Sequence, residues 1–252
     1  TGITDNMHWI LLRGLTRERA HWGDFPERLR AAFPGQHFHL VDLPGTGIHY
    51  REASPATVRA IREQVCRQVR HIPRPFSILA LSMGGMVALD WAQHAEPGEL
   101  QHLVLINTSS GFSRPWQRMQ PAAWPKILRL LVRRELFHRE RDILRLTSNR
   151  DIPLSLCKAW YSIQRQRPVS FTNARNQLLA AARFKPLEKR PMADALILAS
   201  KGDRIASWYC SAELERRWCW TLKLHPDAGH DLPLDEPEWV IRQMGDWIPG
   251  TR

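Results

Sequence analysis

The chain has 252 residues, of which 43% are apolar and 24% are charged, and its formal net charge is +11. This length allows one large α/β domain or two small ones with a well-filled core. No apolar run reaches the roughly 18 residues of a membrane-spanning helix, and residues 1–5 do not resemble a signal peptide. The four cysteines have neither metal-ligand nor Cys-x-x-Cys spacing. We therefore expect reduced thiols, a cytoplasmic location and no metal site.

Short apolar runs alternate with amphipathic segments along both outer parts of the chain. The expected strands are residues 9–12, 38–41, 78–81, 103–107, 195–199 and 220–224. The expected helices in these parts are residues 20–33, 54–70, 84–94 and 236–247. Ser54 followed by Pro55 predicts the start of the second helix. Continuous apolar strands between helices favour an α/β fold, with a mostly parallel central sheet covered by helices on both faces.

Residues 112–190 interrupt this alternation and hold the excess positive charge. They contain 18 Lys and Arg against 5 Asp and Glu, which leaves 18 basic and 20 acidic residues in the rest of the chain. The expected helices of this segment are residues 124–137, 140–146, 155–164 and 171–183, with no strand between them. We therefore expect a basic, all-helical cap at 112–190, inserted after the strand that ends near Asn107. Residues 1–111 and 191–252 then form the α/β core.

Ser82 lies at a predicted strand-to-helix turn between two small residues, Ala80 and Gly84. This pattern is typical of a nucleophile elbow, in which larger flanking side chains collide with the neighbouring strand and helix. The helix that follows has the positive end of its dipole beneath the serine, which favours a developing negative charge. An ordinary turn can also contain serine and glycine, so residues elsewhere in the chain must show whether Ser82 is a nucleophile.

A nucleophilic serine needs a general base, and the base needs an acid that orients it. In open α/β sheets such groups collect beyond the carboxyl ends of the strands. Asp203 follows the fifth expected strand in a glycine-containing turn, and His230 follows the sixth directly after Gly229. We therefore expect a triad of Ser82, Asp203 and His230. The other acidic residues near these turns are expected to be solvated: Asp194, Asp227, Asp231 and Asp235.

Acyl transfer also requires backbone N–H donors that stabilise the tetrahedral oxyanion. One expected donor is Met83, directly after the serine. The other is Leu15, in the loop after the first strand, where Gly14 allows the backbone to turn.

These motifs resemble the α/β-hydrolase superfamily over nearly the whole chain. The residues that carry the resemblance are Arg13-Gly14, Asp42-Leu43-Pro44-Gly45-Thr46-Gly47, Ser82-Met83-Gly84-Gly85, Gly202-Asp203 and Gly229-His230. The run of residues 107–113 is similar to the corresponding region of the small capped serine esterases of the pimeloyl carrier-protein ester esterase group. The superfamily usually has histidine where this chain has Arg13, which leaves the packing of that loop open.

The resemblance implies a serine hydrolase that cleaves carboxylic esters of small to medium acyl chains through an acyl-enzyme, without a cofactor. A C–O lyase of the same fold is an alternative, but that family has arginine where this chain has Met86. Epoxide hydrolases and dehalogenases have aspartate at position 82, whereas cofactor-free haloperoxidases share the triad. A non-catalytic binding protein on a hydrolase scaffold is a further alternative.

Aromatic residues of the expected cap, together with one from the helix expected at 20–33, are candidates for the walls of the acyl pocket. They are Trp22, Phe112, Trp116, Trp124, Trp160 and Phe171. The basic cap is either a solvated surface or a docking site for an acidic acyl carrier protein. The arginines that would make this docking site are Arg129, Arg133, Arg134, Arg141 and Arg145. In the second case the substrate is a carrier-bound ester or thioester. The segment has no nucleic-acid-binding motif, so we expect no nucleic acid partner; the oligomeric state stays open.

Overall fold

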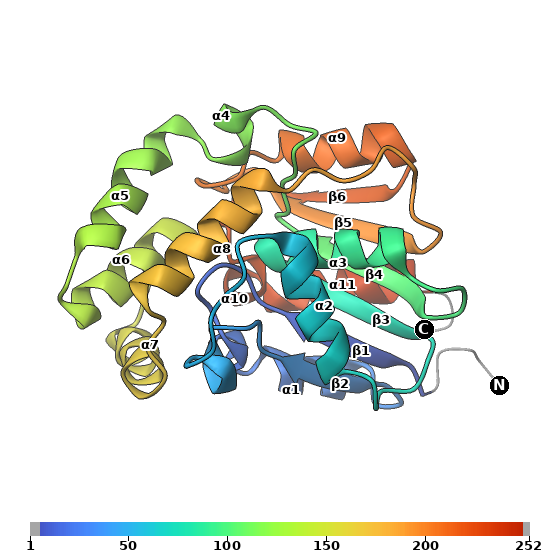
Figure 1. Cartoon of the computed structure of the whole chain (residues 1–252), viewed down its shortest axis with the longest axis horizontal. Helices are drawn as coiled ribbons and strands as arrows, with labels where there is room; N and C mark the ends of the chain where they lie inside the picture. Colours follow the sequence, from blue (N-terminus) through green and yellow to red (C-terminus); the bar gives the residue numbers. More distant parts are fainter. Residues whose placement is uncertain (1–5, 249–252) are drawn as a thin grey trace.

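The computed structural model describes residues 6–248, so residues 1–5, where we expected no signal peptide, lie outside the described residues. Six strands form one sheet in the order β2-β1-β3-β4-β5-β6, and every neighbouring pair is parallel (Figure 1). The strands are β1 (His8–Leu12), β2 (His37–Val41), β3 (Phe76–Leu81), β4 (Leu100–Ile106), β5 (Asp194–Ser200) and β6 (Thr221–His225). All six expected strands are therefore present, each within a few residues of its expected bounds.

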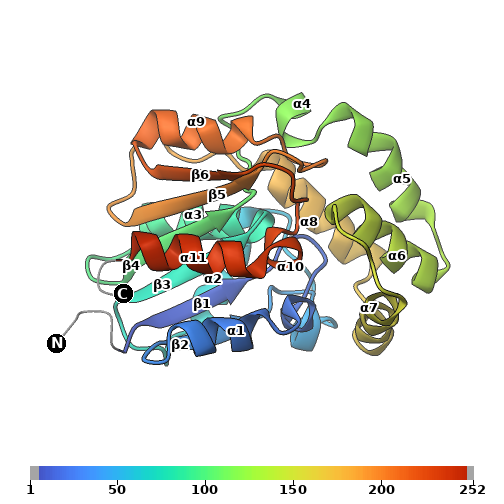
Figure 2. The same ribbon diagram turned by 180° about the vertical axis from the view of Figure 1, so that it is seen from behind.

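Helices cover both faces of the sheet, which explains why the central strands are apolar throughout. Every residue of β3 is buried, as expected for a parallel strand that has no solvent face. On one face the core includes residues of α2 (Val58–Gln68), α3 (Met83–His94) and α9 (Tyr209–Trp218). On the other face it includes residues of α1 (Phe25–Ala32) and α11 (Pro237–Trp247) (Figure 2). The α/β prediction is confirmed.

The helix expected at 20–33 is divided in the structure. A 3₁₀ helix, η1 (Arg19–Trp22), comes first, and α1 starts only at Phe25. Gly23 lies between them with φ of 60°, a left-handed conformation that ends the first turn. The continuous helix was therefore a wrong prediction.

The helix expected from Ser54 begins later, at Val58. Thr57 is its cap, because the Thr57 hydroxyl accepts a hydrogen bond from the N–H of Ala60 at 3.2 Å. Ser54 instead donates its hydroxyl to the carbonyl of Pro44 at 2.8 Å and is buried. Ser54, which predicted the start of a helix, thus stabilises the preceding loop instead. A second 3₁₀ helix, η2 (Gly47–His49), lies in the loop between β2 and α2.

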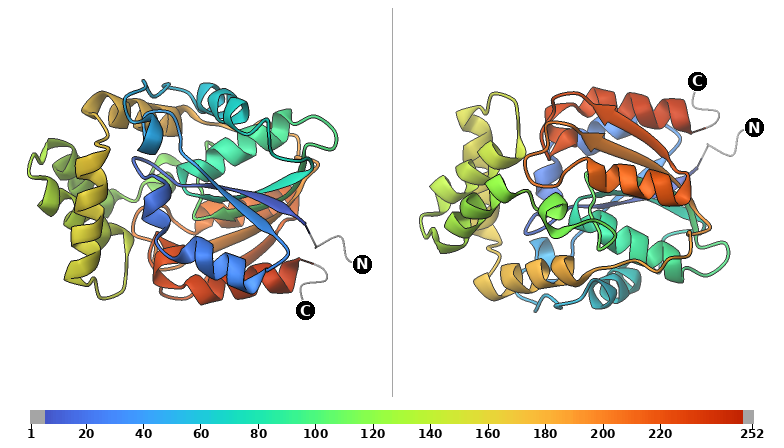
Figure 3. Two further views of the ribbon diagram at one scale, coloured as in Figure 1. Left: turned by 90° about the horizontal axis from the view of Figure 1, so that it is seen from below. Right: turned by 90° about the horizontal axis from the view of Figure 1, so that it is seen from above.

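Between β4 and β5 the chain forms helices and no strand, as the sequence predicted. They are α4 (Pro115–Arg118), η3 (Pro121–Ala123), α5 (Trp124–Val132), α6 (Leu136–Thr147), α7 (Leu154–Gln166) and α8 (Phe171–Arg183). The helix expected at 124–137 is divided, because Glu135 caps α6 by accepting a hydrogen bond from the N–H of His138. All these helices lie beyond one end of the sheet, far from the start of β1 and the end of α11 (Figures 1 and 3).

Candidate active site

Ser82 occupies a tight turn between β3 and α3. Its φ of 56° and ψ of −118° lie outside the regions that residues with a side chain favour. Two backbone hydrogen bonds stabilise the turn. The N–H of Ser82 donates to the carbonyl of Ile106 at 2.8 Å, and the N–H of Gly85 donates to the carbonyl of Ser82 at 2.9 Å. A Cβ on Gly84 would lie 2.7 Å from two carbonyl oxygens, those of Leu12 and Arg13. Among the described residues the Ser82 hydroxyl makes no hydrogen bond, so the structure joins Asp203 to His230 but does not join His230 to Ser82.

Asp203 and His230 come together beyond the ends of β5 and β6. Asp203 Oδ2 and His230 Nδ1 are 2.7 Å apart, and both side chains are buried. The other carboxylate oxygen accepts hydrogen bonds from the N–H groups of Ile205 and Ala206 at 2.8 and 3.1 Å, which fixes its orientation. The acid thus contacts His230 through Nδ1. In Ser-His-Asp triads Nδ1 faces the acid and the other ring nitrogen faces the reacting group.

The electrostatics of this pair favour a charged imidazole. Burial by itself would lower the pKa of His230. The negative charge of Asp203 and the hydrogen bond to it outweigh burial, so the pKa of His230 is raised above its usual value. An imidazole in this setting accepts a proton readily at neutral pH.

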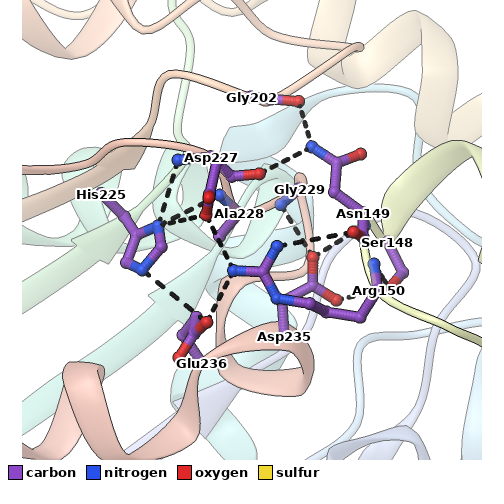
Figure 4. Close-up of polar contacts among 10 residues, drawn as sticks. All are labelled: Ser148, Asn149, Arg150, Gly202, His225, Asp227, Ala228, Gly229, Asp235 and Glu236. Carbon is purple, nitrogen blue, oxygen red and sulfur yellow. Dashed lines mark hydrogen bonds and ion pairs between the residues drawn. The ribbon is translucent and has the colours of Figure 1, made fainter.

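A segment directly after α6 connects the turns that hold Asp203 and His230 (Figure 4). The amide of Asn149 donates hydrogen bonds to the carbonyls of Gly202 and Asp227, at 2.8 and 3.0 Å. Gly202 is the neighbour of Asp203 in sequence, and Asp227 is in the loop that leads to His230. One side chain from the helical segment therefore joins both loops.

Asp235 makes a second connection in the same place. Its carboxylate accepts hydrogen bonds from the N–H groups of Gly229 and Asn149, both at 2.8 Å, and from the Ser148 hydroxyl. Asp235 is buried, so the expectation that it is solvated was wrong. Sequence reasoning missed Asn149 and Asp235, because nothing in their local pattern indicates partners so distant in the chain.

Charged residues surround this connection on its outer side. Arg150 pairs with Asp227 and Glu236 at 2.9 and 2.6 Å, and His225 Nδ1 accepts the N–H of Ala228 at 3.0 Å (Figure 4). Asp227 and Asp194 are exposed, as expected from the sequence.

Asp231 is the second acid whose expected solvation was wrong. It is buried and forms a two-point ion pair with Arg13, with Nη2–Oδ2 and Nη1–Oδ1 distances of 3.0 and 3.3 Å. The guanidinium of Arg13 also lies over the Trp22 ring, 5.1 Å from its centre. Arg13 therefore connects the loop after β1 to the turn that holds His230.

The loop of Gly14 and Leu15 lies against the Ser82 turn. A Cβ on Gly14 would come within 3.1 Å of the Ser82 Cβ and 3.6 Å of the backbone nitrogen of Met83. Met83 is the first residue of α3, so its N–H has no acceptor within the helix. The two expected oxyanion donors thus come from segments that adjoin Ser82, Met83 directly after it and Leu15 in the loop that packs against its turn.

The six aromatic candidates for the acyl pocket do not form one cluster. Trp22, Phe112 and Trp160 pack into or against three different apolar clusters. Their ring neighbours are Phe25 for Trp22, Trp218 for Phe112 and His21 for Trp160. The other three are exposed: Trp116, Trp124 and Phe171.

Neither a metal cluster nor a membrane-spanning helix is found within residues 6–248. These residues contain no group of three or more His, Cys, Asp or Glu side chains that could hold a metal ion. They also contain no helix long and apolar enough to cross a membrane.

A comparison of the sequence with known protein families agrees with the fold and with the order of Ser82, Asp203 and His230 along the chain. Residues 9–243 match the alpha/beta hydrolase family. The chain belongs to this family. The fold and the strand-end positions of Ser82, Asp203 and His230 are those expected for an α/β hydrolase.

Individual relatives of this α/β hydrolase add detail. The pimeloyl-[acyl-carrier protein] methyl ester esterase of Chromobacterium violaceum is 38% identical over 88 residues, which are 34% of this chain and 32% of that protein. The chain therefore matches about a third of the length of this curated relative.

Solved structures share the fold over almost the whole α/β hydrolase. A candidate non-heme bromoperoxidase of Mycobacterium tuberculosis H37Rv has a TM-score of 0.78 at 18% identity, covering 100% of this chain and 94% of the other. The esterase EaEST of Exiguobacterium antarcticum has a TM-score of 0.77 at 15% identity, covering 96% and 92%. At these identities the similarity establishes the fold alone.

Proposed function

We propose that this α/β hydrolase is a serine esterase that cleaves carboxylic esters through an acyl-enzyme on Ser82. The observation that carries the proposal is the 2.7 Å contact between Asp203 and His230. It joins the turns after β5 and β6, on the same edge of the sheet as the Ser82 turn after β3. This edge is where reacting groups collect in open α/β sheets.

In the proposed first step the Ser82 hydroxyl attacks the ester carbonyl while His230 Nε2 accepts its proton. Asp203 holds the ring through Nδ1 and stabilises the imidazolium. The N–H groups of Leu15 and Met83 bind the oxyanion, each donor contributing about 10²–10³ in rate. His230 then returns the proton to the departing alcohol, which leaves Ser82 acylated.

In the second step water replaces the alcohol and repeats the sequence in reverse. His230 removes a proton from the water, the hydroxide attacks the acyl carbonyl, and Ser82 leaves with that proton. The products are the free acid and the regenerated serine. No step requires a metal or an organic cofactor.

We further propose that residues 112–190 form a cap over a core made of 1–111 and 191–252. The position of α4–α8 beyond the strand ends supports this division (Figure 1). An acyl chain of small to medium length would then lie between the cap and Ser82. Trp116 and Phe171 stay candidates for its walls because both are exposed, whereas Trp124 shares the exposed side of α5 with Leu128 and Val132.

The test compares turnover of p-nitrophenyl esters of increasing acyl length by the unmodified chain, Ser82→Ala and Ser155→Ala. Ser155 is an exposed serine on α7 and serves as the matched control. We expect Ser82→Ala to lose at least about 10³ of kcat/KM, and Ser155→Ala to lose nothing. Full activity of Ser82→Ala would refute the nucleophile. Covalent labelling of Ser82 by a fluorophosphonate probe would exclude a non-catalytic binding protein.

A second candidate substrate is an ester on an acidic acyl carrier protein, and a basic pocket favours it. A cavity of about 360 Å³ lies between α5 and α6. Its cationic lining residues are Lys126, Arg129, Arg133, Arg141, Arg145 and Arg204. Asp142 is the acidic residue of the lining, and it already pairs with Arg133 at 2.6 Å. The name of the partial relative, which acts on a carrier-protein ester, agrees with this candidate.

The C–O lyase alternative has less support. Met86, which stands in place of the lyase arginine, is buried. The nearby guanidinium of Arg118 donates to the carbonyls of Ala181 and Ala182. Its charge is therefore committed to the backbone of α8.

A further inference from the structure

The helix α5 exposes an apolar stripe to solvent. Trp124, Leu128 and Val132 follow one another at a spacing of four residues, and 49%, 61% and 76% of their surfaces are exposed. Successive residues are about 100° apart around a helix, so these three fall within an arc of about 80°. No residue of α5 is fully buried. Most exposed helices of soluble proteins instead turn such a stripe toward the core.

The opposite side of α5 is basic. Lys126 and Arg129 fall within an arc of about 60° that is centred roughly 130° away from the stripe. Arg133 and Arg134 follow at the end of the helix, and residues 124–134 contain no acidic residue. A helix with tryptophan and aliphatic residues on one side and Lys and Arg on the other is typical of segments that lie in a membrane interface.

The position of α5 leaves this stripe accessible. The helix lies at the end of the molecule opposite the start of β1 and the end of α11 (Figures 1 and 2). Its residues Ile127, Leu130 and Leu131 are half-buried. The residues of the stripe are more exposed and take no part in the apolar clusters of the described residues. The Trp124 indole donates to the carbonyl of Met119 at 2.7 Å, which fixes the ring at one end of the stripe.

Exposed apolar residues are also concentrated around this helix in sequence. Eight of the eleven large apolar side chains that are exposed within residues 6–248 belong to the segment 112–190. The same segment holds all the excess positive charge of the chain. Exposed apolar surface and positive charge thus coincide in one part of the molecule, which favours a partner that is both apolar and anionic.

We propose that α5 docks this protein on an anionic lipid surface. The stripe of Trp124, Leu128 and Val132 enters the boundary between head groups and acyl chains. Lys126, Arg129 and Arg134 bind the anionic head groups around it.

A lipid surface fits this face better than an acidic protein does. An acidic protein bound at the basic pocket, whose lining includes Lys126 and Arg129, would neutralise these cations but would leave the stripe in water. A membrane satisfies both sides of the helix, because its apolar interior and its anionic head groups are adjacent. The proposal goes beyond the proposed esterase activity and does not depend on it, since lipid binding is measured without a substrate.

The experiment measures flotation of the full chain with vesicles of phosphatidylcholine, with and without phosphatidylglycerol. We expect binding to the anionic vesicles that exceeds binding to pure phosphatidylcholine at least about tenfold and weakens with salt. The variant Leu128→Ser/Val132→Ser should lose at least about tenfold in partitioning. Lys126→Gln/Arg129→Gln should reduce the difference between the two kinds of vesicle.

Met192→Ser is the matched control. Met192 is 89% exposed and precedes β5, so it lies at the opposite edge of the sheet from α5. This variant should float like the unmodified chain, and melting curves should show that all variants remain folded.

Three results would each overturn the proposal. The unmodified chain could fail to float with anionic vesicles. The Leu128→Ser/Val132→Ser variant could float as well as the unmodified chain, which would leave charge alone as the cause. An acidic acyl carrier protein could remove the chain from the vesicles and bind through the same stripe, which would make α5 a protein-docking helix.

Discussion

Arg13 and Asp231 form a buried ion pair with an Nη2–Oδ2 distance of 3.0 Å. Arg13 precedes Gly14 in the loop after β1, and Asp231 follows His230. The pair therefore fixes the loop of one proposed oxyanion donor against the turn of the proposed general base. It also accounts for a departure from the superfamily, which usually has histidine at the position of Arg13.

Removing one partner of this pair should be costly. Arg13→Met leaves the Asp231 carboxylate buried without its counter-charge, so we expect the free energy of unfolding to fall by about 3–5 kcal/mol. Urea denaturation measures this loss. The double variant Arg13→Met/Asp231→Leu should recover most of it. Arg28→Met is the control, because its pair with Glu238 is exposed and contributes about 1 kcal/mol or less. Equal losses in Arg13→Met and Arg28→Met would contradict the role of burial.

The pH dependence of hydrolysis should report the environment of His230. The general base must be neutral, and Asp203 raises the pKa of His230 above its usual value of about 6.5. We therefore expect kcat/KM to increase with pH through an apparent pKa above 6.5. The effect on stability has the opposite sign, since the charged ring is favoured in the folded state. This contribution is complete below pH 6.5 and is lost as pH rises through the folded-state pKa.

The variant Asp203→Asn tests whether the Asp203 carboxylate is the source of the raised pKa of His230. Without the carboxylate charge the acid limb of the profile should move to lower pH, and kcat should fall by about 10⁴ because an amide at this position favours the imidazole tautomer that cannot accept the serine proton. The exposed Asp151→Asn serves as the control and should change neither. An Asp203→Asn profile with an unchanged acid limb would rule out Asp203 as the source of the shift.

Asn149 should act as a positioning residue. Asn149→Ala removes hydrogen bonds to the carbonyls of Gly202 and Asp227, so we expect a loss of about 1–3 kcal/mol in stability. We also expect kcat to fall about tenfold or more with KM little changed, because misplaced catalytic groups weaken the transition state rather than binding.

Asn176→Ala is the matched control for this variant. Its amide donates to the carbonyl of Ser54 at 2.9 Å, away from the turns of Asp203 and His230. It should lose stability without a comparable fall in kcat. If both variants lower kcat equally, Asn149 has only a structural role.

The contrast between Asp203 and Asp235 shows how far the sequence could lead. Asp203 was identified because it follows an apolar strand in a glycine-containing turn and stands in a recognisable order with Ser82 and His230. Asp235 is the last residue of the short helix α10 (Leu232–Asp235), and its partners Ser148 and Asn149 lie nearly ninety residues earlier. Local patterns contain no information about such partners.

The helices show a similar limit. The six strands were predictable because burial on both faces makes them continuously apolar. The helix α9 was missed, because it begins after Trp208 without a side-chain cap or a proline that would mark its start. The start signal at Ser54 failed for the converse reason, since Pro44, distant in sequence, takes up its hydroxyl.

Binding of an acidic acyl carrier protein should depend on the basic pocket between α5 and α6. Its cationic side chains face one carboxylate, that of Asp142, so a carrier protein meets an uncompensated positive field. We expect Arg141→Gln/Arg145→Gln to weaken binding about tenfold or more at low salt, mainly by slowing association. The difference should shrink as salt approaches about 0.5 M, because exposed charges are then screened. Surface plasmon resonance with an immobilised carrier protein measures both effects.

The matched control is Arg165→Gln combined with Arg175→Gln. Both residues are exposed on α7 and α8, outside the pocket, and the pair removes the same net charge. If this control weakens binding as much as Arg141→Gln/Arg145→Gln, the total charge of the helical segment attracts the carrier. If only the pocket variant weakens binding, recognition belongs to the pocket, and esters on a carrier protein should then be hydrolysed with a lower KM than the same esters free in solution.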